Sequence, residues 1–76
     1  MERLVLAFAR ALVQDEESVR VSRFTEGDTE VIELDVAPVD RGRLIGRRGR
    51  TVDALRTLLD AVAERRGLRC ELEILE

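Results

Sequence analysis

The 76-residue sequence contains no histidine, lysine, tryptophan or tyrosine, and only one cysteine and one proline. A single cysteine, Cys70, excludes an intramolecular disulfide, and without histidine the sequence lacks the usual ligands of a structural zinc site. No apolar run approaches the roughly 20 residues that a membrane-spanning helix needs. We therefore expect no metal site, no cofactor and no integral membrane segment.

The missing residue types also weaken most enzyme classes. A nucleotide-hydrolysing P-loop needs a lysine after its last glycine, and the dinucleotide fingerprint Gly-x-Gly-x-x-Gly is absent. Cys70 falls at an inward strand position with no histidine or lysine to activate it, which favours a small core residue over a nucleophile. We expect a protein that is not an enzyme.

The N-terminal sequence and the chain length indicate the cellular compartment, the number of domains and the oligomeric state. Residues Met1 to Arg10 mix charged with apolar side chains, unlike a signal peptide, and the lone thiol suits a reducing compartment, so we expect a cytoplasmic protein. A chain of 76 residues makes one domain, residues 1–76, with little core. Since neither a disulfide nor a metal can stabilise so small a core, a partner chain is the remaining candidate source of stability, and we expect a homodimer.

Charge is distributed unevenly along the chain. The net charge is −3, yet the stretch Arg41 to Arg50 contains five of the thirteen arginines and no carboxylate. The rest of the chain is therefore strongly acidic. Binding of a polyanion is directed to this one stretch.

Hydrophobic periodicity predicts alternating helices and strands. Val5, Phe8, Ala9 and Leu12 follow helical spacing, whereas Ile32, Leu34 and Val36 alternate with acidic residues as in a half-buried strand. We expect Asp40 to cap the short helical turn that begins at Arg41. The predicted order is a helix over Glu2–Gln14, strands over Ser18–Phe24 and Thr29–Ala37, a helical turn over Arg41–Ile45, a helix over Arg50–Arg66 and a strand over Leu68–Leu75.

The connection between the last two helices has the most specific composition. Gly46 and Gly49 flank Arg47 and Arg48, and Arg50 follows. Glycine permits positive φ angles and close approach of the backbone, and a helix N-terminus favours an anion. Arginine adds charge-assisted hydrogen bonds to phosphate oxygens. The segment is therefore a candidate phosphate-binding loop.

With isoleucine before it, this segment resembles the Ile-Gly-x-x-Gly hallmark of the KH domain, whose loop clamps the backbone of four nucleotides. The element order resembles the type II arrangement: an α+β fold, α-β-β-α-α-β, with a three-stranded sheet covered on one face by helices. The sequence Ile45-Gly-Arg-Arg-Gly-Arg-Thr51, followed by Ala54-Leu55-Arg56, is similar to the KhpA family of small bacterial single-KH-domain proteins. The resemblance covers the whole chain.

The resemblance implies single-stranded RNA binding without catalysis, in the role of a post-transcriptional regulator or an RNA chaperone. It also implies self-association and pairing with a second RNA-binding protein that carries KH and R3H domains. Bases would lie in an apolar groove between the loop-flanking helices and a neighbouring strand. The expected RNA-binding residues are Val36, Leu44, Ile45, Gly46, Arg47, Arg48, Gly49, Arg50 and Thr51, with Val52 and Leu55 as further groove candidates.

Two plainer interpretations remain open. The glycine loop can be a tight turn between helices with solvated arginines at its tip. Alternatively, the fold can serve as a dimerisation or scaffold surface with incidental RNA contact. Net acidity, a first helix that is apolar around much of its girth and a second apolar set on the long helix, Ala54, Leu58 and Ala61, favour that alternative.

Overall fold

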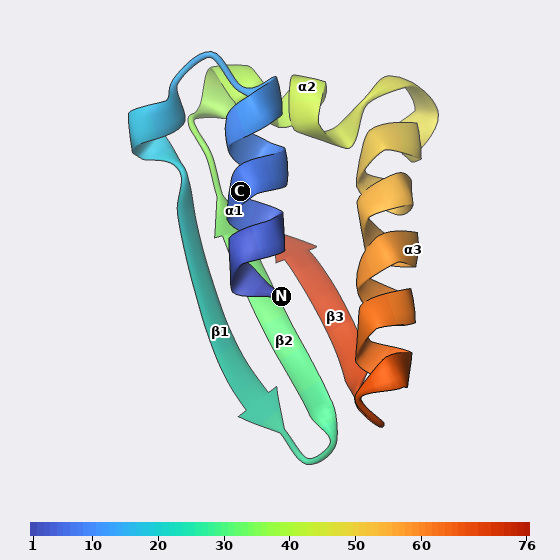
Figure 1. The fold of residues 1–76 in the computed structure, drawn as a ribbon. Helices are drawn as coiled ribbons and strands as arrows, with labels where there is room; N and C mark the ends of the chain where they lie inside the picture. Colours follow the sequence, from blue (N-terminus) through green and yellow to red (C-terminus); the bar gives the residue numbers. More distant parts are fainter.

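The computed structural model describes all residues, Met1 to Glu76, and has the expected α+β fold (Figure 1). The predicted order of helices and strands is confirmed. Three short 3-10 turns join them, at Glu16–Ser18, Pro38–Asp40 and Arg47–Gly49. The elements are α1 (Glu2–Leu12), β1 (Arg20–Glu26), β2 (Thr29–Asp35), α2 (Arg41–Ile45), α3 (Arg50–Arg65) and β3 (Arg69–Ile74).

The sheet has three strands in the order β1-β2-β3. β1 and β2 form an antiparallel hairpin across Gly27 and Asp28, and β3 lies parallel to β2. A parallel neighbour requires a crossover, which α2 and α3 provide. The chain therefore returns to the sheet through the two helices that flank the glycine loop.

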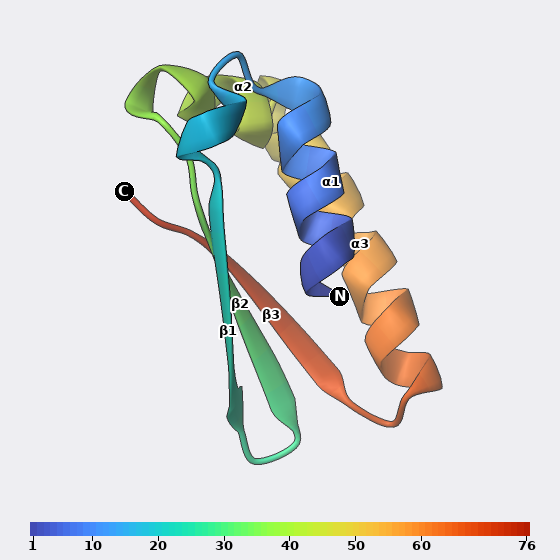
Figure 2. The same cartoon turned by 60° about the vertical axis from the view of Figure 1, so that its left-hand side comes forward.

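All three helices lie on one face of the sheet, and the opposite face carries no helix (Figure 2). The core forms between these layers, with Ile32 and Leu34 of β2, Val5 of α1 and Leu55 and Leu59 of α3 at most 1% exposed. Burying one such side chain contributes about 1.5–3 kcal/mol. None of the helices combines the length and the apolar composition that crossing a bilayer requires.

Several element boundaries differ from the prediction by one or two residues: β2 ends at Asp35 instead of Ala37, α3 ends at Arg65 instead of Arg66, and β3 spans Arg69–Ile74 instead of Leu68–Leu75. α1 ends at Leu12 instead of Gln14, because Val13 turns to an extended conformation with ψ of 158°. β1 begins at Arg20 instead of Ser18, because the acidic residues after α1 form a 3-10 turn. The hairpin extends β1 to Glu26, which pairs with Thr29 directly beside the turn.

The predicted alternation of β2 and β3 is confirmed. Glu33 pairs with Glu73, and both lie on the face without helices, whereas Leu72 is buried against the helices. Two β2 residues depart from the simple pattern. Val31 is 3% exposed although it lies on the open face between its strand partners Phe24 and Glu71.

The second exception is Glu30, a charged residue on the helix-covered face. It is 9% exposed, and the Arg23 guanidinium lies 3.0 Å from its carboxylate. The same guanidinium contacts Glu2 of α1 at 2.8 Å. Glu30 is therefore a paired buried charge that helps to join α1 to the sheet.

Candidate nucleic-acid interface

The glycine loop has a backbone that few residues other than glycine adopt. Gly46 has φ of 78° and ψ of 175°, and Gly49 has φ of 75°. Arg48, with φ of 58°, is the only residue other than glycine in the chain with a positive φ. Such conformations cost energy in an L-residue and concentrate at functional sites.

Gly46 is also required by the space around it. A Cβ atom on Gly46 would lie 2.6 Å from the Cβ of Thr51, in the first turn of α3, and closer still to its hydroxyl oxygen. The loop is further closed by the Gly49 amide, which donates to the Gly46 carbonyl at 3.1 Å. Thr51, a predicted site residue, thus sits against the loop backbone.

Arginine side chains surround this backbone. Arg47, Arg48 and Arg50 are exposed, and none of them makes an ion pair. Arg43 is exposed at the end of α2, whereas Arg41 is half-buried and its Nε has no hydrogen-bond partner. Three guanidiniums beside the loop are therefore free to bind an anion.

The loop delivers this charge to the start of α3, a helix of 16 residues. Gly49 occupies the N-cap position, and no side chain caps the helix there. The first amide groups of α3 and the positive end of its dipole therefore face the arginine-rich loop. The arrangement is suited to holding a phosphate.

The predicted groove residues separate into two groups. Ile45 is 40% exposed beside the loop, so its side chain is available to a ligand. Val36, Leu44, Val52 and Leu55 are between 1% and 5% exposed and belong to the core. The side chains of Val36 and Leu44 are thus covered in this structure. The RNA contact expected at these two residues stays a prediction.

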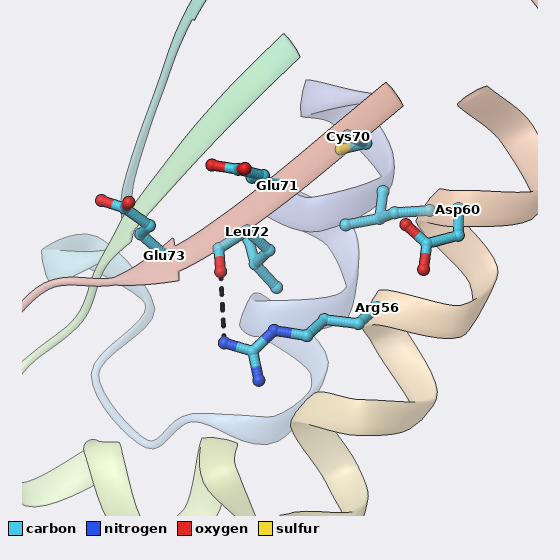
Figure 3. A pocket seen from close by; sticks show the side chains of 7 residues that line it. Arg56, Asp60, Cys70, Glu71, Leu72 and Glu73 are labelled. Carbon is cyan, nitrogen blue, oxygen red and sulfur yellow. Dashed lines mark hydrogen bonds between the residues drawn. The ribbon is translucent and has the colours of Figure 1, made fainter. Parts of the chain in front are cut away.

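A hollow that the sequence did not indicate lies between α3 and β3 (Figure 3). Its volume is about 350 Å³. Arg56 of α3 reaches across it, and its Nη2 donates to the Leu72 carbonyl at 3.2 Å. The lining residues are Arg56, Leu59, Asp60, Cys70, Glu71, Leu72 and Glu73.

The hollow opens along the free edge of β3. The Arg69 amide donates to the carbonyl of Asp28, just before β2, and the Leu75 amide donates to the carbonyl of Leu34, near the end of β2. In a parallel ladder the residues between alternate, so the backbone groups of Leu72 point to the outer edge. Arg56 contacts one of these groups, the Leu72 carbonyl. The only signal for it in the sequence was its position on the helix, about two turns after the loop.

Cys70 lies in the wall of this hollow as a free thiol. Burial raises the pKa of the Cys70 thiol, and the negative charges of Glu30 and Asp60 raise it further. The thiol is therefore protonated and weakly nucleophilic at neutral pH. No group of three or more potential metal ligands occurs in the chain.

The prediction for Asp40 is wrong in its partner. Asp40 precedes α2, but its side chain does not cap that helix. Its two carboxylate oxygens accept hydrogen bonds from the Gln14 amide at 2.9 Å and the Asp15 amide at 3.1 Å. The two amides lie just after the end of α1. The fold brings Asp40 next to them although it follows them by 26 and 25 residues in the sequence.

The hydrogen bonds fix the ionisation of Asp40. The Gln14 amide has the largest effect and lowers the pKa of Asp40 below its usual range, against the opposing effect of burial. The Asp15 amide and the charge of Arg43 lower it further. Asp40 is thus a buried carboxylate that stays ionised at neutral pH.

Comparison with known proteins adds an independent line of evidence. The family model described as "KhpA/KhpB, KH domain" matches residues 2–74. The chain is 42% identical over 76 residues to the "RNA-binding protein KhpA" of Aquifex aeolicus, covering 100% of this chain and 96% of the relative. It is 41% identical over 76 residues to the protein of that name in Chlamydia pneumoniae, covering 100% and 97%.

A third relative, the "RNA-binding protein KhpA" of Halalkalibacterium halodurans, is 42% identical over 76 residues, which is the full length of both chains. No solved structure matches the chain. The expected resemblance is confirmed by a family match and by relatives that span nearly the whole sequence. On this evidence, and with the type of fold and loop described above, the chain belongs to the KhpA/KhpB family of KH domains.

Proposed function

We propose that this chain is a non-catalytic, single-stranded RNA-binding module whose loop Gly46–Gly49 holds the sugar-phosphate backbone. The observation that carries the proposal is the combination of a glycine-only backbone at Gly46 with three exposed, unpaired arginines at the start of a long helix. The relatives of this family are named RNA-binding proteins, which supports the same assignment.

Each loop residue has a distinct part in this proposal. Gly46 and Gly49 let the RNA strand approach the protein backbone of the loop closely, and the amides at the start of α3 face one RNA phosphate. Arg47, Arg48 and Arg50 bind neighbouring phosphate oxygens through charge-assisted hydrogen bonds.

The bases would extend from the loop across Ile45 and into the hollow between α3 and β3. Ile45 is exposed, and the hollow follows the helix that the loop begins. The carboxylates of Asp60, Glu71 and Glu73 in this hollow repel phosphate groups. An RNA strand would therefore turn its bases, and not its phosphates, toward the hollow. The outward backbone groups of β3 and the Arg56 guanidinium offer hydrogen-bond partners to base edges.

Binding of this kind holds a strand without changing its covalent bonds. We therefore propose a role as a post-transcriptional regulator or an RNA chaperone. With few phosphates neutralised and no tyrosine or tryptophan for stacking, one copy would bind with modest affinity.

The test is fluorescence anisotropy of a pool of short labelled single-stranded RNAs. Arg47→Asp/Arg48→Asp should abolish binding. The matched control, Arg65→Asp/Arg66→Asp, makes the same change in charge at the other end of α3 and should bind nearly as wild type. Circular dichroism would show that both variants fold. Equal binding by wild type and the loop variant, or no binding by wild type, would contradict the proposal.

A second candidate function, self-association, is favoured by one observation. Leu58 of α3 is 44% exposed, and Ala54 and Ala61 are exposed one turn before and after it. We propose this apolar strip as the contact between two copies, which would raise RNA affinity through effective concentration. Sedimentation of wild type and Leu58→Glu tests it: a wild type that stays monomeric at micromolar concentration would contradict the dimer. The partner with KH and R3H domains stays a prediction.

A further inference from the structure

We infer that Asp40 is a positioning residue for the RNA-binding loop, because its buried carboxylate ties α2, and the loop that follows α2, to the end of α1. The inference rests on the proposed function, since it concerns how the proposed site is held in place. Asp40 is 0% exposed, and the amides that it accepts lie 25 and 26 residues earlier in the sequence.

The helix that carries the loop needs such a tie. α2 has five residues, and helices shorter than about 12 residues are marginal in water without tertiary contacts. Leu44 is its only buried residue, and an apolar contact of this kind has little directional preference. The two hydrogen bonds to Asp40 are directional and fix the start of α2 against the segment after α1.

The position of α2 determines the position of the first loop residue. The Gly46 amide donates to the Gly42 carbonyl of α2 at 2.9 Å, so the first loop glycine is bonded to the helix itself. The other end of the loop is fixed by α3, where Thr51 touches Gly46. A change in the orientation of α2 would therefore alter the spacing between its end and the start of α3.

The geometry requires a carboxylate specifically. Asp40 meets two amide donors with two acceptor oxygens. An asparagine of the same shape has one acceptor, and its NH₂ group would face the second amide. One of the two amide donors would lose its partner while the volume and the apolar contacts stay the same. Asp40→Asn therefore loosens the tie without emptying the core.

The effect on RNA binding differs from that of a direct contact. If the loop is in its binding arrangement for only a fraction of the time, the apparent dissociation constant rises by the inverse of that fraction. The number of bound phosphates does not change. The dependence of affinity on salt therefore keeps its slope, whereas removing a phosphate-binding arginine would reduce it.

The experiment compares wild type, Asp40→Asn and Val5→Ala, each held well below its unfolding temperature. Val5→Ala is the matched control, because it weakens the core between α1 and the sheet, where Val5 is 0% exposed, and leaves the tie intact. Anisotropy with labelled single-stranded RNA should show binding weakened about three- to tenfold in Asp40→Asn, with an unchanged salt slope, and wild-type affinity in Val5→Ala.

Amide hydrogen exchange provides a readout that needs no RNA. In Asp40→Asn, exchange should accelerate at Gln14 and Asp15 and also at Gly46 to Gly49. Affinity and loop exchange that match those of Val5→Ala would overturn the inference. If wild type binds no RNA, the proposed function fails, and the exchange rates in the loop alone decide whether Asp40 positions it.

A second variant covers the case in which Asp40→Asn does not fold. Gln14→Pro removes one of the two donors and leaves the carboxylate in place, and the extended Val13 before it suits a following proline. Faster exchange in the loop and weaker RNA binding in Gln14→Pro would support the tie. A loop with wild-type exchange and affinity would overturn it.

Discussion

Gly46 and Thr51 pack so closely that a Cβ atom on Gly46 would lie 2.6 Å from the Cβ of Thr51. This contact joins the end of α2 to the first turn of α3 and holds the glycine loop closed. It also explains why the first glycine of the loop tolerates no side chain, since both its φ and its neighbour exclude one.

Gly46→Ala should therefore destabilise the folded protein and weaken RNA binding strongly. Strain at the positive φ and displacement of Thr51 should lower the free energy of unfolding by about 1–3 kcal/mol, measured by chemical denaturation. Gly42→Ala is the control, because a Cβ there meets no atom within 4 Å. It should leave stability unchanged or raise it by up to about 1 kcal/mol. Equal losses in the two variants would contradict the account.

Arg48 should show a trade between stability and binding. Its φ of 58° is unfavourable for an L-residue, and glycine would relieve that strain. We expect Arg48→Gly to raise the free energy of unfolding by up to about 1 kcal/mol while it weakens RNA binding. Arg47→Gly, at the neighbouring position without a positive φ, should give no gain in stability. A loss of stability in Arg48→Gly would mean that the arginine side chain supports the fold.

Arg56 tests where the bases lie. Its hydrogen bond to the Leu72 carbonyl is partly exposed, so Arg56→Ala should cost no more than about 1 kcal/mol of stability. RNA affinity should fall several-fold if bases occupy the hollow, as anisotropy would show. Thr57→Ala, at an exposed neighbouring position, serves as the control. Unchanged affinity in Arg56→Ala would place the bases elsewhere.

Asp40 predicts a dependence of stability on pH. Its pKa is lowered in the folded protein, chiefly by the Gln14 amide, relative to about 3.9 in an unfolded chain. The folded state therefore favours the ionised form, and the stabilisation is complete above the unfolded pKa. It is lost as the pH falls through the folded pKa. Denaturation curves of wild type and Asp40→Asn should converge as the pH falls below about 4, and a constant difference would contradict the assignment.

Much of the fold followed from local patterns. The alternation in Thr29–Asp35 and the helical spacing in α1 and α3 require only that one face be apolar, so periodicity was sufficient. The glycine loop was visible because its residues are unusual in themselves. The ends of α1 and β1 were less predictable, because they depend on a 3-10 turn and on Asp40, which lies far along the chain.

The features that the sequence did not reveal arise from tertiary contacts. Asp40 was expected to cap the adjacent helix, since local capping is the common use of aspartate, but a distant pair of amides competes for it. Val31 looks exposed by alternation, yet its position on the central strand buries it. The hollow beside Arg56 exists only because β3 lies next to α3.

The central claim is that the loop arginines bind the phosphates of single-stranded RNA, and its most direct test is affinity as a function of salt. For two or three phosphates per chain, the logarithm of the binding constant should fall with the logarithm of salt concentration with a slope of about −1.4 to −2. Arg47→Ala/Arg48→Ala should weaken binding and bring the slope closer to zero. A wild-type affinity that does not change with salt, or a double variant with the wild-type slope, would contradict the account.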